Sequence, residues 1–184
     1  MVSKYKETEI GSIPEEWDVT SLSDAFQNLE AGVSVNSDER QNADFFVLKT
    51  SAISDGLINI DEAKPVVKKE YARLKCPVKK GSIIISRMNT PQLVGACGYV
   101  AEDAKGYFLP DRLWQVINSK PEKYDFHWLN YLLNQYRYKN AIHAVATGTS
   151  NSMKNISKER LLEIRIPRPS IEEQKFIVKA ISDI

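Results

Sequence analysis

Five short runs of β-branched and aromatic residues between positions 45 and 117 constrain the fold of this chain more than any other feature. They are "FFVLKTSAI" (45–53), "GLINI" (56–60), "SIIISR" (82–87), "ACGYV" (96–100) and "RLWQVI" (112–117). Such runs are typical of β-strands, and the intervening "SDG", "KKG" and "AKG" contain residues that turns require. Strands spaced this closely favour a mixed, partly closed sheet over a doubly wound one.

Helical patterns lie on both sides of the strand region. "SLSD" is a capping-box sequence, and the apolar residues after it predict a first helix from Leu22 to Glu30, with Gly32 as its C-terminal cap. From Asp125 to Ala144 the apolar period becomes that of a second helix. Its predicted apolar stripe consists of Leu129, Leu132, Leu133 and Tyr136.

The last thirty residues alternate between helix and strand signals. Ser157 is a plausible N-cap of a short helix, "EIRIP" alternates like a strand that closes the sheet, and "SIEE" at Ser170 is a second capping box. An apolar seam then begins and is unfinished when the sequence ends, so we expect it to face a partner helix. Its predicted interface residues are Ile177, Ile181 and Ile184. The expected fold is α+β (mixed α/β), a small twisted, partly closed β-sheet flanked by helices, with the start of a long C-terminal helix.

Composition indicates a globular, cytoplasmic protein. Of 184 residues, 42% are hydrophobic and 27% are charged, as in folded domains. There is no run of roughly 18 apolar residues for a membrane span and no secretory signal at the start. Cys76 and Cys97 are far apart and lack a C-x-x-C context, which predicts buried free thiols in a reducing compartment.

Charge is distributed unevenly along a chain whose formal net charge is only +1. Residues 1–44 contain three Lys/Arg and ten Asp/Glu, whereas residues 64–87 contain eight and one, and residues 137–168 contain seven and two. Two basic blocks on a neutral chain are compatible with one positive face in the fold. They are equally compatible with two solvated surfaces that share no direction.

The residue patterns of common enzymes are missing. The two histidines, His127 and His143, are too far apart on the predicted helix to form a metal pair, and no phosphate-binding loop or nucleophile elbow is present. "EAK" at Glu62 to Lys64, with Asp44 or Asp55, resembles half of a nuclease metal site but is common by chance. We therefore expect no catalytic residue, no metal site and no cofactor bound by this chain.

A binding surface is better supported than an active site. The loop "SRMNTPQL" presents Arg87, Asn89, Thr90 and Gln92 directly after a strand. Arg reads guanine, and Asn or Gln reads adenine, by paired hydrogen bonds in the major groove of DNA. An ordinary polar loop is the alternative. Arg112 is expected on the same side of its strand as Trp114, and Arg112 and Lys49 are further candidates for DNA binding.

A second polar segment, "TGTSNSMKNIS" at residues 147–157, connects two predicted helices and contains no acidic residue. Small hydroxyl and amide groups, backbone N–H groups and a lysine are the usual donors to DNA phosphates. A Ser/Thr-rich connection that satisfies its own turns is the alternative. Lys139 and Lys158 flank the segment. Its candidate DNA-binding residues are Thr149, Asn151, Ser152 and Lys154.

Three stretches combine into a recognisable pattern. They are "IGSIPEEW" near the start, "KKGSIIISR" before the polar loop, and "TGTSNSMKNISKERLLEIRIPRPSIEEQKFIVKAI" at the end. Together they resemble the target recognition domain of specificity (S) subunits from type I restriction–modification systems, over nearly the whole chain. The resemblance implies a non-catalytic module that reads one half of a bipartite target in double-stranded DNA.

The same resemblance implies domain organisation and partners. Residues 1–168 would be the recognition domain, and residues 169–184 would begin the conserved helical spacer and dimerisation region. That region would dock DNA methyltransferase (modification) subunits and support self-association. S-adenosylmethionine, ATP and Mg are expected on partner subunits, including a restriction/translocase subunit. A full S subunit has two recognition domains and two long helices, so this chain is expected to be a fragment or a half-subunit.

Two further functions remain open at this point. One is an interaction module that tethers or inhibits DNA methyltransferase subunits without reading sequence. The other is a metal-dependent nuclease built on the "EAK" triplet. Salt-dependent binding with a strong preference for one short DNA sequence would distinguish a DNA-reading module from a module that only tethers subunits. Mg²⁺-dependent nicking of DNA by the chain would support the nuclease.

Overall fold

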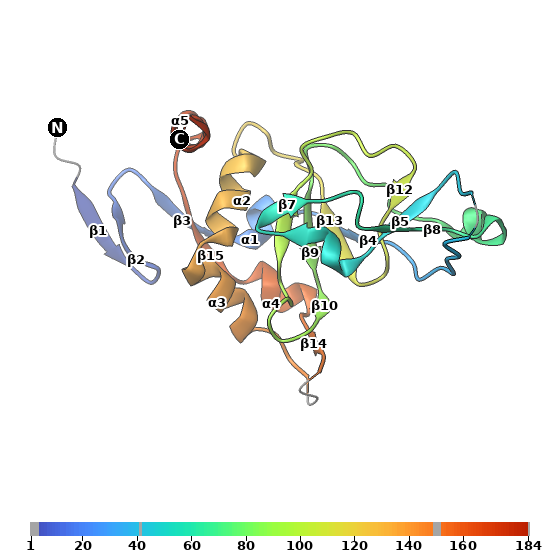
Figure 1. The fold of residues 1–184 in the computed structure, drawn as a ribbon. Helices are drawn as coiled ribbons and strands as arrows, with labels where there is room; N and C mark the ends of the chain where they lie inside the picture. The colour runs from blue at the N-terminus through green and yellow to red at the C-terminus, as the bar shows by residue number, and fades with distance from the viewer. Residues whose placement is uncertain (1–3, 41, 149–151, 184) are drawn as a thin grey trace.

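The computed structural model describes residues 4–40, 42–148 and 152–183. Its centre is a six-stranded sheet in which β7 and β11 are parallel and the other neighbours are antiparallel (Figure 1). In spatial order its strands are β4 (Leu29–Ala31), β13 (Leu113–Val116), β9 (Ile83–Ser86), β11 (Cys97–Tyr99), β7 (Gly56–Ile58) and β6 (Ile53–Ser54). The α+β class is confirmed. Because β4 and β6 are the two edges of a linear strand order, this sheet is open.

All five predicted strand runs contain strands, and burial explains their composition. The central strand β9 is buried on both faces: Ile83 and Ile85 belong to one hydrophobic cluster, and Ile84 belongs to another. Alternation along the strand sends neighbouring side chains to opposite faces of the sheet. The near-continuous isoleucine run therefore reflects a strand between two cores.

Helices cover one of these faces (Figure 1). They are α1 (Leu22–Ala25), α2 (Phe126–Asn134), α3 (Tyr136–Ala144), α4 (Lys158–Leu162) and α5 (Ile171–Ser182). In the described parts of the chain, no helix has the length and apolar character needed to cross a membrane. The other core lies toward a smaller three-stranded sheet with two 3-10 helices. These elements are β5 (Phe46–Leu48), β8 (Ala63–Pro65), β12 (Tyr107–Phe108), η1 (Thr50–Ala52) and η2 (Lys68–Arg73).

The first helix is shorter than predicted. It ends at Ala25 rather than Glu30, because Leu29–Ala31 form strand β4 and pair with β13. Tertiary pairing here overrides local helical periodicity. Gly32 is consequently not a helix cap. It follows β4, where a Cβ would lie 1.6 Å from the carbonyl oxygen of Leu109, so only glycine permits this close approach of two backbone segments.

The long predicted helix is broken in two. Asp125 caps α2 by accepting hydrogen bonds from the backbone N–H groups of His127 and Trp128, but Gln135 is extended (φ −66°, ψ 145°) and α3 starts anew after it. The break takes Tyr136 out of the predicted apolar stripe, and its side chain is 82% exposed. The buried face of α3 instead consists of Tyr138 and Ile142.

One segment from the first part of the chain pairs with one from the last part beside the helical layer. A hairpin of β1 (Tyr5–Thr8) and β2 (Gly11–Pro14) leads into β3 (Asp18–Ser21), which pairs with β15 (Arg165–Arg168). The strand predicted from "EIRIP" therefore exists, but it forms a separate two-stranded sheet and does not close the main one. The predicted N-caps are confirmed at Ser157 and Ser170, whose side chains accept backbone hydrogen bonds. The capping box predicted at Ser21 is wrong, because Ser21 precedes α1 without a side-chain cap bond.

Asp24 links the first helix to the C-terminal part of the fold. Its carboxylate accepts hydrogen bonds from Lys120 Nζ at 2.5 Å and from Tyr124 Oη at 2.7 Å, and it lies 3.5 Å from a guanidinium nitrogen of Arg168. The Lys120 hydrogen bond, followed by that of Tyr124, lowers the pKa of Asp24 below its ordinary 3.8. The ionised carboxylate is thus favoured in the folded state.

Replacing Asp24 by asparagine is therefore expected to destabilise the fold in a pH-dependent way. A lowered folded-state pKa means that the contribution is present above about pH 4 and disappears as the pH falls through the folded value. We expect the free energy of unfolding to drop by about 1 kcal/mol at pH 7, a modest figure because the site is partly solvated. Urea unfolding at pH 7 and pH 3 measures this. Asp103→Asn, at an exposed position, is the control. If the Asp24 variant were as much less stable at pH 3 as at pH 7, the ionised carboxylate of Asp24 would not be the source of the stability.

Candidate nucleic-acid interface

Two polar segments that are distant in the sequence lie side by side in the structure. Strand β10 (Met88–Asn89) pairs antiparallel with β14 (Lys154–Asn155), and Thr147 forms an additional bridge with Asn155. The loop "SRMNTPQL" (86–93, the reading loop) and the segment around Lys154 are thus joined by one two-stranded ribbon, β10 and β14, which lies beside α4 in Figure 1. Neither segment by itself indicates this pairing.

Arg87 occupies the junction between this ribbon and the main sheet. Its backbone N–H donates to the carbonyl oxygen of Arg112 at 3.0 Å, and its own carbonyl accepts from the N–H of Ile156 at 2.9 Å. The side chain lies over the ring of Trp114, with Cζ 5.4 Å from the ring centroid. Trp114 is 2% exposed, so it belongs to the core and is not an open stacking platform.

The cations of this region are not neutralised by acids. Arg165 and Arg168 of β15 are different, because they pair with Glu9 and Asp18, both at 2.6 Å. For the described residues, no carboxylate lies within ion-pair distance of any of five cations around the ribbon: Arg87, Arg112, Lys139, Lys154 and Lys158. Unpaired positive charge is what contacts to DNA phosphates require.

Asn89 behaves differently from the prediction. Its side chain is 9% exposed, its Nδ2 donates to Ser86 Oγ at 3.1 Å, and its Oδ1 accepts from the backbone N–H of Thr90 at 2.8 Å. Both ends of the amide therefore shape the turn, which counts against a contact between Asn89 and a base. The neighbouring Thr90 and Gln92 are exposed at the surface of the loop.

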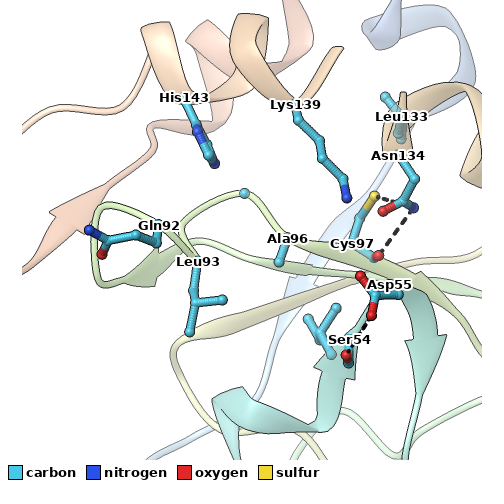
Figure 2. Close-up of a pocket in the computed structure, with 12 residues that line it drawn as sticks. Ser54, Asp55, Gln92, Leu93, Ala96, Cys97, Leu133, Asn134, Lys139 and His143 are labelled. Carbon is cyan, nitrogen blue, oxygen red and sulfur yellow. Dashed lines mark hydrogen bonds between the residues drawn. The ribbon is translucent and has the colours of Figure 1, made fainter. Parts of the chain in front are cut away.

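Gln92 lies at a small pocket of about 160 Å³ between the reading loop and α3 (Figure 2). Lys139 and His143 project from α3 into this pocket. Asn134, at the end of α2, donates to the sulfur and the carbonyl oxygen of Cys97. The loop approaches α3 closely at Gly95, where a Cβ would be 2.2 Å from Ile142 Cγ2. From the sequence, Lys139 is predicted only to flank the 147–157 segment, and His143 is considered only for a metal pair. Their place at this pocket could not be predicted, because the residues that face them come from a distant segment.

Lys49 and Arg112 line a second, open concavity, together with Lys64. Lys49 Nζ is 3.8 Å from Glu62, a partly exposed ion pair that contributes little to stability. Arg112 is exposed and lies next to Arg87 through the backbone contact described above. The structure thus brings Lys49 and Arg112 together at one end of the basic region.

The segment around Lys154 is partly self-bonded. Lys154 Nζ donates to the carbonyl oxygen of Gly148 at 2.7 Å, in agreement with the alternative that this connection satisfies its own turn. Its charge is not cancelled by that contact, since the acceptor is neutral. Ser152 is exposed. Thr149 and Asn151 lie outside the described residues.

The residues of the "EAK" triplet, Glu62 to Lys64, do not form a nuclease metal site among the described residues. Glu62 accepts a hydrogen bond from Ser51 and faces Lys49, and across residues 4–40, 42–148 and 152–183 no three His, Cys, Asp or Glu side chains converge as metal ligands. Both cysteines are free and buried, as predicted. Burial raises the pKa of Cys97 to about 12 and that of Cys76 to about 11, so neither is a thiolate nucleophile at neutral pH.

The residues predicted to form an apolar seam on the C-terminal helix differ in their exposure. Ile177 is partly buried and packs against the domain's own core, which departs from the expected position on a free interface. Ile181 is 42% exposed, and the unpredicted Phe176 is 71% exposed. Ile184 lies outside the described residues. The reason for the difference is that α5 rests on α2, which takes up one side of its apolar surface.

Comparisons with known proteins agree on one family. The family model "Type I restriction modification DNA specificity domain" matches residues 14–184. Two proteins of Methanocaldococcus jannaschii are similar: one named as the type I restriction enzyme MjaX specificity subunit (28% identical, 97% of this chain) and the type I restriction enzyme MjaVIII specificity subunit (29%, 98% of this chain). This chain spans 42% of the length of each.

Solved structures show the same fold. The HsdS subunit from Thermoanaerobacter tengcongensis matches with a TM-score of 0.66 at 20% identity, over 93% of this chain and 42% of that one. The S subunit of the type I restriction–modification system from M. genitalium matches with a TM-score of 0.57 at 20% identity, over 90% of this chain and 38% of that one. The family model extends from the second strand to the end of the chain, so this protein belongs to the family of type I restriction–modification DNA specificity domains.

Proposed function

We propose that this chain is a target recognition domain that binds double-stranded DNA, reads one half of a bipartite target and performs no catalysis itself. The observation that carries the proposal is the pairing of β10 with β14 beside Arg87. It joins a loop with base-reading side chains to a segment rich in phosphate donors, within a group of unpaired cations. Family membership supports this function over the tethering alternative.

The proposed contacts follow from exposure and charge. Arg87, Thr90 and Gln92 would approach base edges, whereas Asn89 would only support the turn. Arg112, Lys49, Ser152 and Lys154 would contact the DNA backbone, and Lys139 and His143 would extend the contact surface around Gln92. Thr149 and Asn151 remain proposed contacts from their residue types alone.

The proposed partners follow from the family and from α5. Residues 1–168 would form the recognition domain, and residues 169–184 would begin a helical spacer. Exposed Phe176 and Ile181 would contact a second helix or a DNA methyltransferase (modification) subunit, and a restriction/translocase subunit would join the full complex in the cytoplasm. S-adenosylmethionine, ATP and Mg would be bound by those partner subunits.

Selection from a random duplex pool tests this function. The chain should enrich one short motif and bind it far more tightly than a scrambled duplex at the same salt concentration. If the bound duplexes shared no motif, the chain would not be a sequence-specific DNA-binding domain. If the same protein bound DNA methyltransferase (modification) subunits in a separate sedimentation experiment, that result would favour the tethering role.

Lys154→Ala should weaken binding to all duplexes about equally. One phosphate contact contributes roughly 0.9 to the slope of log affinity against log salt concentration, so the magnitude of the slope should fall by about that amount. The preferred sequence should stay the same. Lys175→Ala removes the same charge from an exposed position on α5 and serves as the control. A wild-type slope in the Lys154 variant would instead identify the 147–155 connection as a self-satisfied turn.

A further inference from the structure

One buried indole contacts two of the unpaired cations. Trp114 lies in β13 between its partners Ala31 on β4 and Ile85 on β9, and it is 2% exposed. Arg87 Cζ is 5.4 Å from the ring centroid, and Lys158 Nζ is 5.9 Å from it. Both distances are within the range in which a cation is attracted to an aromatic ring. A single core side chain therefore connects the strand that precedes the reading loop with α4.

The Arg87 guanidinium contacts the ring of Trp114 and has no acidic partner among the described residues. Its Nε is buried without a hydrogen-bond partner. The backbone on either side is held by Arg112 and Ile156. Because guanidinium donors lie in the plane of the group, a contact with a ring leaves donor edges available for a ligand.

Lys158 is held from two directions. Its Nζ donates to the carbonyl oxygen of Leu29 at 2.7 Å and faces the ring of Trp114. Neither partner is an acid, so the charge of Lys158 remains uncompensated. Arg87 and Lys158 thus add positive potential next to the ribbon while both are ordered in the free protein.

We propose, on the basis of the function proposed above, that Trp114 is a positioning residue for DNA recognition, which acts by fixing the Arg87 guanidinium before DNA arrives. Long side chains lose rotamer entropy when they bind, and a group that is already ordered loses less. Fixed donors also discriminate between bases better than mobile ones, since only one base presents acceptors at their positions. The ring therefore contributes to specificity without touching DNA.

The test compares two Trp114 variants with a matched core variant. Trp114→Leu removes the ring, Trp114→Phe keeps an aromatic face, and Val116→Ala perturbs the same strand at a fully buried residue for which no cation contact is found in the described chain. Affinities for the selected duplex and for single-base variants are measured well below each thermal transition. Trp114→Leu should reduce discrimination roughly 3- to 10-fold at the base pair that Arg87→Ala affects. Trp114→Phe should retain most of it, and Val116→Ala should retain all of it.

A double variant distinguishes positioning from a general loss of stability. In the Arg87→Ala background, Trp114→Leu should cause no further loss of discrimination, because the group that it positions is already gone. Independent losses in the two variants, or an equal loss in Val116→Ala, would overturn the positioning role. A wild-type protein that binds DNA without any base preference would refute the proposed function itself, which is a different result from additive losses in a specific binder.

Discussion

Arg87→Ala is expected to cost roughly 1–3 kcal/mol of binding free energy on the preferred duplex and to relax the preference at one base pair. Arg87 follows the central strand β9, and its backbone is held on both sides by Arg112 and Ile156. Its guanidinium has no acidic partner in the described chain and is supported by the ring of Trp114. An arginine with these properties presents two parallel donors, the geometry that guanine accepts in the major groove.

Affinities for the preferred duplex and for its single-base variants, measured at one salt concentration, test this expectation. Arg165→Ala is the matched control, because it removes the same charge from β15, where Glu9 already neutralises it. Should Arg87→Ala weaken every duplex equally and leave the preferred motif intact, Arg87 would contact a phosphate. If both affinity and motif are unchanged, Arg87 has no direct role in binding.

Gln174→Ala is expected to lower the free energy of unfolding by about 2–4 kcal/mol, because it leaves three backbone groups, one buried and two partly buried, without their hydrogen-bond partner. Gln174 is fully buried in the first half of α5. Its Oε1 accepts from the N–H of Asp125 at 2.8 Å, and its Nε2 donates to the carbonyl oxygens of Lys123 and Pro169 at 2.9 and 3.0 Å. The amide therefore fastens α5 to the start of α2.

Thermal unfolding should show a decrease in Tm of roughly 5–15 °C for Gln174→Ala. Glu172→Ala changes an exposed residue in the same turn and should have little effect. Equal stability of the two variants would show that packing alone, rather than the buried amide, holds α5 in place. The segment "PSIEEQ" (169–174) therefore holds the start of α5 in place by three contacts. Ser170 caps the helix, Glu173 accepts a hydrogen bond from the indole of Trp17, and Gln174 attaches α5 to the start of α2.

The sequence by itself determined the features that depend on nearby residues. The β-branched runs form strands, and the hydroxyls of Ser157 and Ser170 cap the helices that follow them. A cap needs only a side-chain oxygen two or three residues from a free N–H group, and a strand run needs only a regular alternation of side chains.

Only the tertiary structure decided which distant segments meet. Pairing with β13 makes Leu29–Ala31 a strand although their local pattern is helical, and the break at Gln135 places Tyr136 in solvent. The same holds for the candidate interface, where β10 pairs with β14 and Asn89 turns inward to bond Ser86. These outcomes depend on contacts between residues far apart in the chain, whose free energies exceed the small local preferences that periodicity and residue type express.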